Sequence, residues 1–319
     1  MPEFVWPDAD RRDKIGKRIQ RVDGPVKVTG KARYTYDINR PGMLFARVLR
    51  CPHAHARIVS IDTSRAEKMP GVRAIRVVQD VGAEIQWALD EIAFVAAETD
   101  EQAADAVAAI DVQYEVLPHF VTEEDIDAAP EKNPGQEETV GDPDGAAATA
   151  AIRTSGYYGI LPISHCCLEA HGQVCEWEDE NHMTAWASTQ AVSSLPGQFA
   201  EGVGIPAANV RVLTDYMGGG FGSKFNVDRW GIECARLAKE TGAPVKLMLD
   251  RDAELSVAGD RPSSYGEIEV GADDQGNILY WSSRTWGSGG IGGAGSPPVP
   301  YVFQIPNRKH QHTSIPVNV

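Results

Sequence analysis

The sequence predicts a chain of mixed α+β and α/β class, and three observations support this prediction. Strand-like and helix-like segments alternate from about residue 25 to residue 118. An acidic stretch rich in turn-forming residues follows. A strand, a glycine-rich loop, a helix and a second strand then succeed one another, which is the order of a βαβ unit. The predicted organisation is an arm over 1–14, an α+β domain over 15–118, an acidic linker over 119–150 and an α/β domain over 151–319.

The first domain combines several strands with one alanine-rich helix. Segments 44–49 and 57–61 have strand composition, and 73–78 is apolar enough for a strand that is buried on both faces. Asp100 is a suitable N-cap for a helix over 101–110. The alternating segment 112–116 predicts the strand that follows this helix.

The second domain is organised around a glycine-rich loop at 217–225. A strand over 209–214 precedes the loop, and Asn226 is expected to cap a helix over 227–241. Gly242 suits the left-handed position that ends such a helix. A strand over 244–249 follows, and the pattern predicts that the strands on either side of the helix form a parallel pair.

The last part of the sequence predicts a β-hairpin. Segments 265–270 and 278–286 alternate as strands and are joined by turn-forming residues. Residues 287–295 hold six glycines. This glycine-rich segment is either a linker or a bent strand that lies close to another backbone.

Composition excludes several function classes. The 319 residues suggest about two domains. The 30 basic and 45 acidic residues give a net charge of −15, which argues against nucleic acid or an anionic membrane as partners. The sequence contains no 18-residue apolar run and no signal-peptide pattern at its start. The scattered cysteines are expected to be reduced thiols in a cytoplasmic protein, and they are Cys51, Cys166, Cys167, Cys175 and Cys234.

The glycine-rich loop reads Met-Gly-Gly-Gly-Phe-Gly-Ser-Lys-Phe and lies between a predicted strand and a predicted helix. Free backbone N–H groups in such a turn suit an anionic, oxygen-rich ligand. A Walker-type phosphate loop is excluded because Ser223 stands where the second glycine is required. The dinucleotide fingerprint fails at the same position. A tight turn without a ligand is the alternative.

Two further groups of side chains raise the question of a metal site. His53 and His55 share a face of a strand but have no third ligand nearby, so a structural role is favoured. Residues 165–171 hold two histidines, a glutamate and two cysteines, but adjacent cysteines are poorly spaced for tetrahedral zinc. Glu169 is either a general base or, as we favour, a buried carboxylate hydrogen-bonded to backbone. No metal ligand is therefore predicted.

Several of these motifs together resemble one known family. Residues 186–190 (Trp-Ala-Ser-Thr-Gln) and 218–224 (Gly-Gly-Gly-Phe-Gly-Ser-Lys) resemble two cofactor-site segments of the molybdenum hydroxylases, the xanthine dehydrogenase and aldehyde oxidase family. Other motifs follow in the family's order, and the resemblance spans roughly 14–319; these motifs lie at 15–34, 49–58, 96–99, 114–118 and 165–172. The resemblance implies a hammerhead-type domain over 15–118 and the first part of a molybdopterin-binding domain over 151–319.

The resemblance also implies site residues. Gln190 would donate its amide N–H to an oxo group of molybdenum, and backbone near Phe221 would face the metal; the implied cofactor-binding set is Gln190, Gly219, Gly220, Phe221 and Gly222. Phe225 stands where purine-oxidising members carry a carboxylate. It therefore favours an aldehyde, aromatic or other less polar substrate, with a core phenylalanine as the alternative. Lys224 fits less well, because an exposed cation is disfavoured at a helix start.

The family's catalytic base, a glutamate in a glycine-flanked segment, has no match in this sequence, and the family's Arg-Ala-Pro-Gly-type segment is absent as well. We therefore expect no catalytic residue in this chain, which resembles the N-terminal half of a large subunit that is either split over two genes or truncated. The base is expected on a partner chain, and the chain alone is expected to be inactive.

The implied function is a subunit of a hydroxylase or dehydrogenase that oxidises a small aldehyde or an aromatic or heterocyclic substrate with oxygen from water. The implied cofactor is molybdenum-molybdopterin, with its cytosine dinucleotide form as one alternative. The implied partners are a second molybdopterin-binding chain, an iron–sulfur subunit and, as a further candidate, an FAD subunit. A cofactor-free scaffold or assembly subunit, and a hydratase or dehydroxylase of the same family, are the competing functions.

Overall fold

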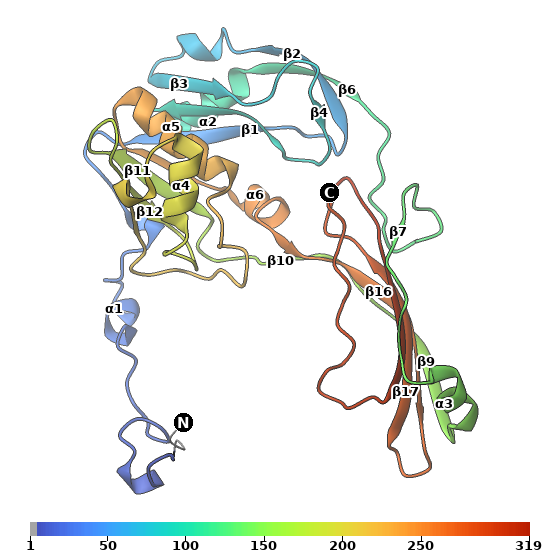
Figure 1. The fold of residues 1–319 in the computed structure, drawn as a ribbon. Helices are drawn as coiled ribbons and strands as arrows, with labels where there is room; N and C mark the ends of the chain where they lie inside the picture. The colour runs from blue at the N-terminus through green and yellow to red at the C-terminus, as the bar shows by residue number, and fades with distance from the viewer. Residues whose placement is uncertain (1–4) are drawn as a thin grey trace.

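Two β-sheets organise the chain, and a long connection joins them (Figure 1). The computed structural model describes residues 5–319, so part of the predicted arm over 1–14 lies outside the described residues. The larger sheet has seven strands in the order β13-β12-β11-β14-β1-β5-β3. These strands are β1 (Leu44–Arg50), β3 (Val72–Val77), β5 (Glu91–Ala97), β11 (Gly172–Trp177), β12 (Met183–Ala187), β13 (Val210–Leu213) and β14 (Val245–Met248).

The larger sheet crosses the predicted boundary between the two domains. β1 pairs in parallel with β14, with Leu44 opposite Val245. Strands from both halves of the chain therefore share one hydrogen-bonded sheet. The domain bounds stay predictions.

The strands and the helix predicted for the first half are confirmed. A small sheet of β4 (Glu84–Ile85), β2 (Ala56–Asp62) and β6 (Asp111–Val116) accompanies α2 (Asp100–Ala109). The cap of α2 is not Asp100 but Thr99, whose hydroxyl accepts from the Gln102 N–H at 3.2 Å, and Gln102 returns a bond to the Thr99 N–H. Asp100 is instead paired with Arg47 of β1.

The prediction that the strands before and after α5 (Asp228–Thr241) are adjacent in the sheet is wrong. β13 and β14 run in the same direction, but β12 and β11 lie between them. The reason is that β11 and β12 form a hairpin that occupies the middle of this half of the sheet. The helix after the loop is confirmed as α5 (Asp228–Thr241), and Gly242 ends it at φ +62°.

Asn226 does not cap α5. Val227 occupies the N-cap position, and no side chain of the cap residue bonds to the helix. The side-chain oxygen of Gln198 instead accepts from the Val227 N–H at 2.8 Å. Gln198 belongs to α4 (Leu195–Val203), which packs beside α5. A tertiary contact thus replaces the local cap.

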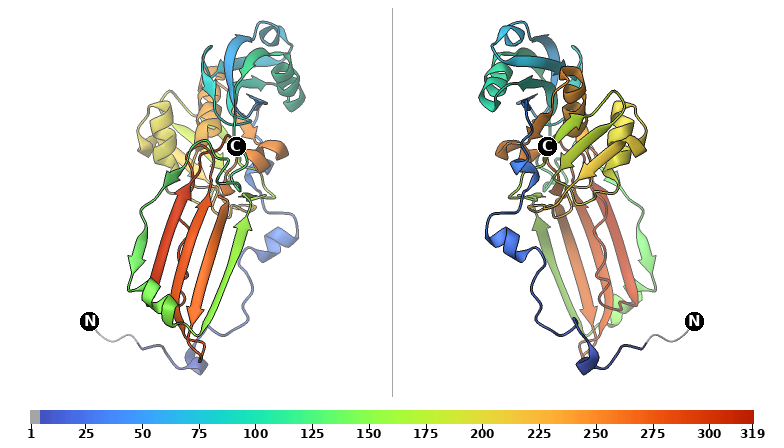
Figure 2. Two further views of the ribbon diagram at one scale, coloured as in Figure 1. Left: turned by 90° about the vertical axis from the view of Figure 1, so that its right-hand side faces the viewer. Right: turned by 90° about the vertical axis from the view of Figure 1, so that its left-hand side faces the viewer.

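The second sheet consists of long strands, which Figure 2 shows side by side. The predicted hairpin is confirmed as β16 (Ser264–Ala272) and β17 (Ile278–Gly287). Its neighbours are β9 (Ile152–Ile160) and β18 (Asn307–Ser314). The segment 119–150 adds β7 (Asn133–Pro134), β8 (Glu138–Val140) and α3 (Pro143–Thr149), of which the two strands pair with β18.

A two-stranded junction of β10 (Ile163–Ser164) and β15 (Asp260–Arg261) links the two sheets. The remaining helical segments are α1 (Gly24–Val28), α6 (Arg251–Ser256) and the 3-10 turns η1 (Ala9–Arg11), η2 (Thr35–Asp37), η3 (Ala66–Lys68) and η4 (Ala207–Asn209). Among the described residues, no helix is both long and apolar enough to cross a bilayer.

A substitution at Phe94 measures how much the core of the larger sheet contributes to the stability of the protein. This residue lies in β5, whose residues are all buried, and its side chain is part of the largest apolar cluster. We expect Phe94→Ala to lower the free energy of unfolding by about 3–5 kcal/mol. Val59→Ala at an exposed position of β2 is the control and should change it by less than about 0.5 kcal/mol. Urea unfolding measures both, and equal effects would place the stabilising core elsewhere.

Candidate functional site

The glycine-rich loop joins β13 to α5 through a strained path. Gly219 and Gly222 have φ of +104° and +107°, a region that only glycine adopts without strain. Phe221 between them also has positive φ, at +53°, which is costly for an aromatic residue. Its side chain is 72% exposed. Such strain gathers at functional sites, because ordinary packing gives no reason to keep it.

Gln190 is fastened to this loop. Its side-chain oxygen accepts from the Gly222 N–H at 2.9 Å, and its backbone N–H donates to the Lys224 carbonyl at 2.8 Å. A Cβ at Gly220 would overlap that side-chain oxygen, so only glycine fits there. The structure thus brings together every predicted cofactor-binding residue.

The bonding of Gln190 fixes which end of its amide is available. Because the oxygen is held by the loop, the Nε2 group points away from it and has no hydrogen-bond partner in the described part of the chain. An amide N–H is the group that can donate to a ligand oxygen. The cofactor role of Gln190 stays a prediction, but its orientation agrees with that role.

Three consecutive backbone donors in the loop are also unused. The N–H groups of Gly219, Gly220 and Phe221 have no acceptor among the described residues, whereas those of Gly218, Gly222 and Ser223 do. Buried backbone N–H groups are almost always paired in folded proteins, and Gly220 is buried. A row of free donors on a glycine turn is therefore a cradle for an anionic ligand.

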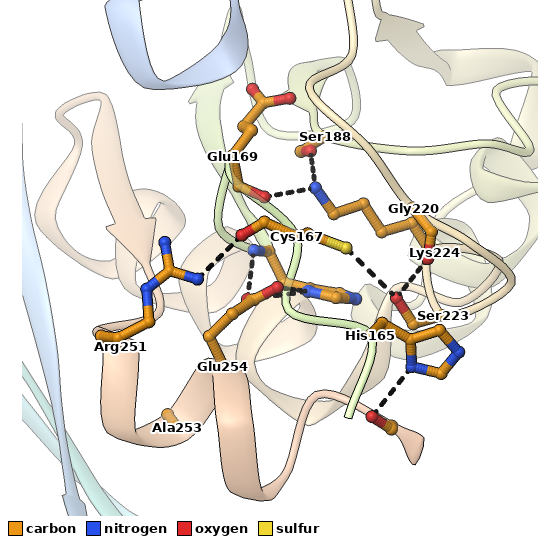
Figure 3. A network of polar contacts seen from close by, with 12 residues as sticks. His165, Cys167, Glu169, Ser188, Gly220, Ser223, Lys224, Arg251, Ala253 and Glu254 are labelled. Atoms are coloured by element: carbon orange, nitrogen blue, oxygen red, sulfur yellow. Dashed lines mark hydrogen bonds and ion pairs between the residues drawn. The ribbon is translucent and has the colours of Figure 1, made fainter. Parts of the chain in front are cut away.

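Lys224 corrects the expectation from the sequence, which placed an exposed cation at the start of the helix. Its side chain is only 1% exposed, and its ammonium donates to the Glu169 carbonyl at 2.7 Å and to the Ser188 hydroxyl at 2.6 Å (Figure 3). α5 begins four residues later, so the loop is free to turn this side chain inward. Burial lowers the pKa of Lys224, and Glu169 opposes that shift.

Glu169 is the buried carboxylate that the sequence analysis favoured. One oxygen accepts from the Gly218 N–H at 2.6 Å and the other accepts from the Thr35 N–H at 3.0 Å. A Cβ at Gly218 would overlap the Glu169 side chain, so the loop presses directly against it. The role of Thr35 was not predicted, because a contact through its backbone N–H leaves no trace in residue type.

Glu169 and Gly218 also line a groove of about 810 Å³ between the two halves of the chain. Its other walls include Tyr34 and Phe45 from the first half and Asp250 and Arg251 from the second. Neither Gln190 nor Phe221 belongs to this lining. Gly218 is thus the loop residue that faces the groove, while the free donors of the loop are a separate feature.

The histidines and cysteines of residues 165–171 are not gathered around one point. His171 Nδ1 bonds to the Glu254 carboxylate at 2.9 Å, whereas His165 bonds to the Gly259 carbonyl at 3.0 Å. The Cys167 thiol lies 3.9 Å from the Ser223 hydroxyl, and burial raises its pKa. Across residues 5–319, no set of three or more His, Cys, Asp or Glu side chains is placed to hold a metal ion.

Phe225 and the two early histidines lie outside this network. The Phe225 side chain is half exposed rather than packed in the core, so the core alternative is not supported, and its role in a substrate pocket stays a prediction. His55 bonds to the Pro118 carbonyl and to Glu84, while His53 packs edge-on against Tyr114. Separate partners of this kind agree with a structural role for both histidines.

The loop, its free donors and the oriented amide have the hydrogen-bonding chemistry expected of a site for an anionic, oxygen-rich ligand on an α/β scaffold. Known proteins agree with this class. Residues 126–308 match the molybdopterin cofactor-binding domain family, and residues 29–89 match the a/b hammerhead domain of aldehyde oxidase and xanthine dehydrogenase. The chain therefore belongs to the xanthine dehydrogenase and aldehyde oxidase family of molybdenum hydroxylases.

Individual relatives show how far the similarity reaches. The chain is 31% identical over 309 residues to the aldehyde oxidoreductase molybdenum-binding subunit PaoC of Escherichia coli (strain K12), covering 90% of this chain and 42% of that protein. It is 29% identical to the nicotinate dehydrogenase large molybdopterin subunit of Eubacterium barkeri, covering 89% of this chain and 73% of that protein. Quinoline 2-oxidoreductase from Pseudomonas putida 86 shares the fold, with a TM-score of 0.82 at 23% identity over 95% of this chain and 44% of that chain. The chain thus spans less than half the length of several relatives that it matches.

Glu254 offers a pH-dependent test of the buried network. Burial raises the pKa of this carboxylate, but hydrogen bonds and charge from His171 outweigh burial, and the net shift is downward. A lowered pKa gives stability that is complete above about pH 4.5 and is lost as the pH falls through the folded-state value. We expect Glu254→Gln to cost about 1–3 kcal/mol at pH 7, and we expect the difference from the wild type to shrink between pH 4.5 and pH 3.

Urea unfolding at several pH values measures this difference. Glu101→Gln, at an exposed position of α2, is the matched control and should show no such trend. A difference between Glu254→Gln and the wild type that stayed constant down to pH 3 would contradict the assigned pair.

Proposed function

We propose that this chain forms one wall of the molybdopterin site in a molybdenum-dependent hydroxylase or dehydrogenase. The observation that carries the proposal is the row of free N–H groups at Gly219, Gly220 and Phe221 beside the oriented Gln190 amide. An anionic, oxygen-rich cofactor satisfies donors of this kind. The membership of the family supports the same ligand.

The residues present fit that cofactor. When bound, it supplies the redox centre at which a small substrate is oxidised with oxygen derived from water. The three loop N–H groups would hold its anionic oxygens, and Gln190 would donate from Nε2. Because the oxygen of Gln190 is held by Gly222, the amide cannot rotate and presents a donor in a fixed direction. Lys224 and Glu169 hold the two ends of the loop in place.

The catalytic carboxylate is proposed to come from another polypeptide segment. Glu169 is the candidate that the sequence offers in this chain, but both of its oxygens already accept backbone N–H groups. A general base needs a free oxygen within reach of the proton that it removes. We therefore assign Glu169 a positioning role, and we assign the base to a second molybdopterin-binding chain or segment.

The substrate is proposed to be a small aldehyde or an aromatic or heterocyclic compound. The half-exposed Phe225 offers apolar surface near the loop and no acceptor for a purine. The names of the aldehyde, nicotinate and quinoline enzymes among the relatives support this substrate range. Electrons are proposed to leave through an iron–sulfur subunit, with an FAD subunit as a further partner. The five free cysteines support a cytoplasmic location.

Gly220→Ala tests whether the loop N–H groups of Gly219, Gly220 and Phe221 bind the cofactor. The added Cβ would overlap the Gln190 oxygen, so the amide must move and the loop must open. We expect the purified native complex to lose about tenfold or more of its molybdenum and pterin content. Gly197→Ala in α4 is the control, because a Cβ meets nothing within 4 Å there. Full metal content in Gly220→Ala would contradict the proposed role of the loop, whereas a native wild-type complex without molybdenum would favour the cofactor-free scaffold.

Gln190→Glu separates the two ends of the amide. Glutamate keeps an acceptor for the Gly222 N–H, but it lacks the donor and adds a negative charge beside an anionic cofactor. We expect molybdenum content to fall about 10- to 100-fold, as measured by elemental analysis. Gln275→Glu in the exposed hairpin turn makes the same charge change and should leave the metal unchanged. Where metal is retained, product analysis in labelled water distinguishes hydroxylation from hydration or dehydroxylation.

A further inference from the structure

Gln198 of α4 holds the segment that carries Phe225 by two hydrogen bonds from one side-chain amide. Its Nε2 group donates to the Phe225 carbonyl at 3.2 Å, and its Oε1 atom accepts from the Val227 N–H at 2.8 Å. A backbone carbonyl only accepts and a backbone N–H only donates, so these two bonds fix the orientation of the amide. Gln198 thus binds the backbone on both sides of Asn226.

The same stretch of chain also holds the preceding part of the glycine-rich loop. The Gln190 side chain accepts from the Gly222 N–H, and the Gln190 backbone N–H donates to the Lys224 carbonyl. Residues 190–198 therefore contact the second half of the loop at several points. The N-cap residue of α5 makes no side-chain bond to its helix, so these contacts, and not a local cap, set the path of the chain after Lys224.

The two residues that Gln198 binds have side chains in different surroundings. Val227 is 4% exposed and belongs to the largest apolar cluster. Phe225 is 46% exposed and belongs to none of the apolar clusters of the described residues. An aromatic ring buries a large area when it packs in a core, and the Phe225 ring has no such packing to hold it. Its position follows from the backbone that Gln198 binds.

We propose that Gln198 is a positioning residue that sets substrate specificity through Phe225. Its two bonds hold the Phe225 ring beside the loop, where the ring is available to stack on an aromatic substrate. A substrate without a ring gains little from this contact. The inference rests on the proposed function, because it takes Phe225 as part of the substrate pocket. It adds a residue of α4, which need not touch the substrate, to the determinants of specificity.

Benzaldehyde and acetaldehyde are the probes, and the purified native complex is the enzyme. The measured quantity is the ratio of kcat/KM for benzaldehyde to kcat/KM for acetaldehyde. We expect Phe225→Ala to lower this ratio about three- to tenfold, mainly through a higher KM for benzaldehyde, because the lost contact is one aromatic pair. Gln198→Met keeps the size of the side chain but forms neither hydrogen bond, and we expect it to lower the ratio by a similar factor.

The double variant shows whether Gln198 acts through Phe225. We expect Gln198→Met added to Phe225→Ala to lower the ratio no further, because the ring that Gln198 positions is already gone. Gln198→Glu keeps the acceptor for the Val227 N–H and loses the donor to the Phe225 carbonyl, so it should lower the ratio too, and it serves where Gln198→Met does not assemble. Hydrogen exchange needs no substrate, and the Val227 amide should exchange faster in Gln198→Met than in the wild type.

Arg236→Met is the matched control, because Arg236 of α5 donates to the Gly202 carbonyl of α4 at 2.8 Å and so joins the same two helices away from Phe225. It should leave the ratio unchanged. Equal changes in Gln198→Met and Arg236→Met, or a further loss in the double variant, would overturn the proposal. So would a complex that holds molybdenum but oxidises neither aldehyde. A complex without molybdenum would overturn the proposed function itself, and molybdenum content is therefore measured in every sample.

Discussion

The buried ammonium of Lys224 is the constraint on which the geometry of the site depends. A cation inside a protein is tolerated only where acceptors replace its water. Here the acceptors are the Glu169 carbonyl and the Ser188 hydroxyl, which come from two different segments. Lys224 therefore holds the end of the glycine-rich loop, the segment before β11 and the end of β12 at one point. The Glu169 carboxylate remains free to bind the other end of the loop at Gly218.

This double anchoring explains why the loop stays open at its centre. Both ends are fixed and Gln190 is bonded to Gly222. Between them Gly219 and Phe221 take positive φ values, and the N–H groups of Gly219, Gly220 and Phe221 find no acceptor among the described residues. The strain at Phe221 and the free donors are thus two results of one arrangement, and a ligand that accepts from them removes part of its cost.

The sequence predicted what depends on local pattern and missed what depends on distant contacts. The glycines, the Gln190 motif and the α5 helix were predictable because each is a short, characteristic run. The inward turn of Lys224 was not, since its acceptor lies 55 residues earlier in the chain. The pairing of β1 with β14 joins segments about two hundred residues apart, which no local pattern encodes. The prediction that Asn226 caps α5 was wrong for the same reason, because the Val227 N–H donates to Gln198 of another helix.

The hydrogen bonds of the buried carboxylates near the site decide whether these groups can act as a base. Glu169 has given both oxygens to backbone N–H groups, and Glu254 has given both to His171. Neither has an uncommitted oxygen with which to take a proton, so these two residues hold the scaffold together. Carboxylates whose oxygens are already hydrogen-bonded agree with the proposal that the proton-transferring base comes from outside these residues.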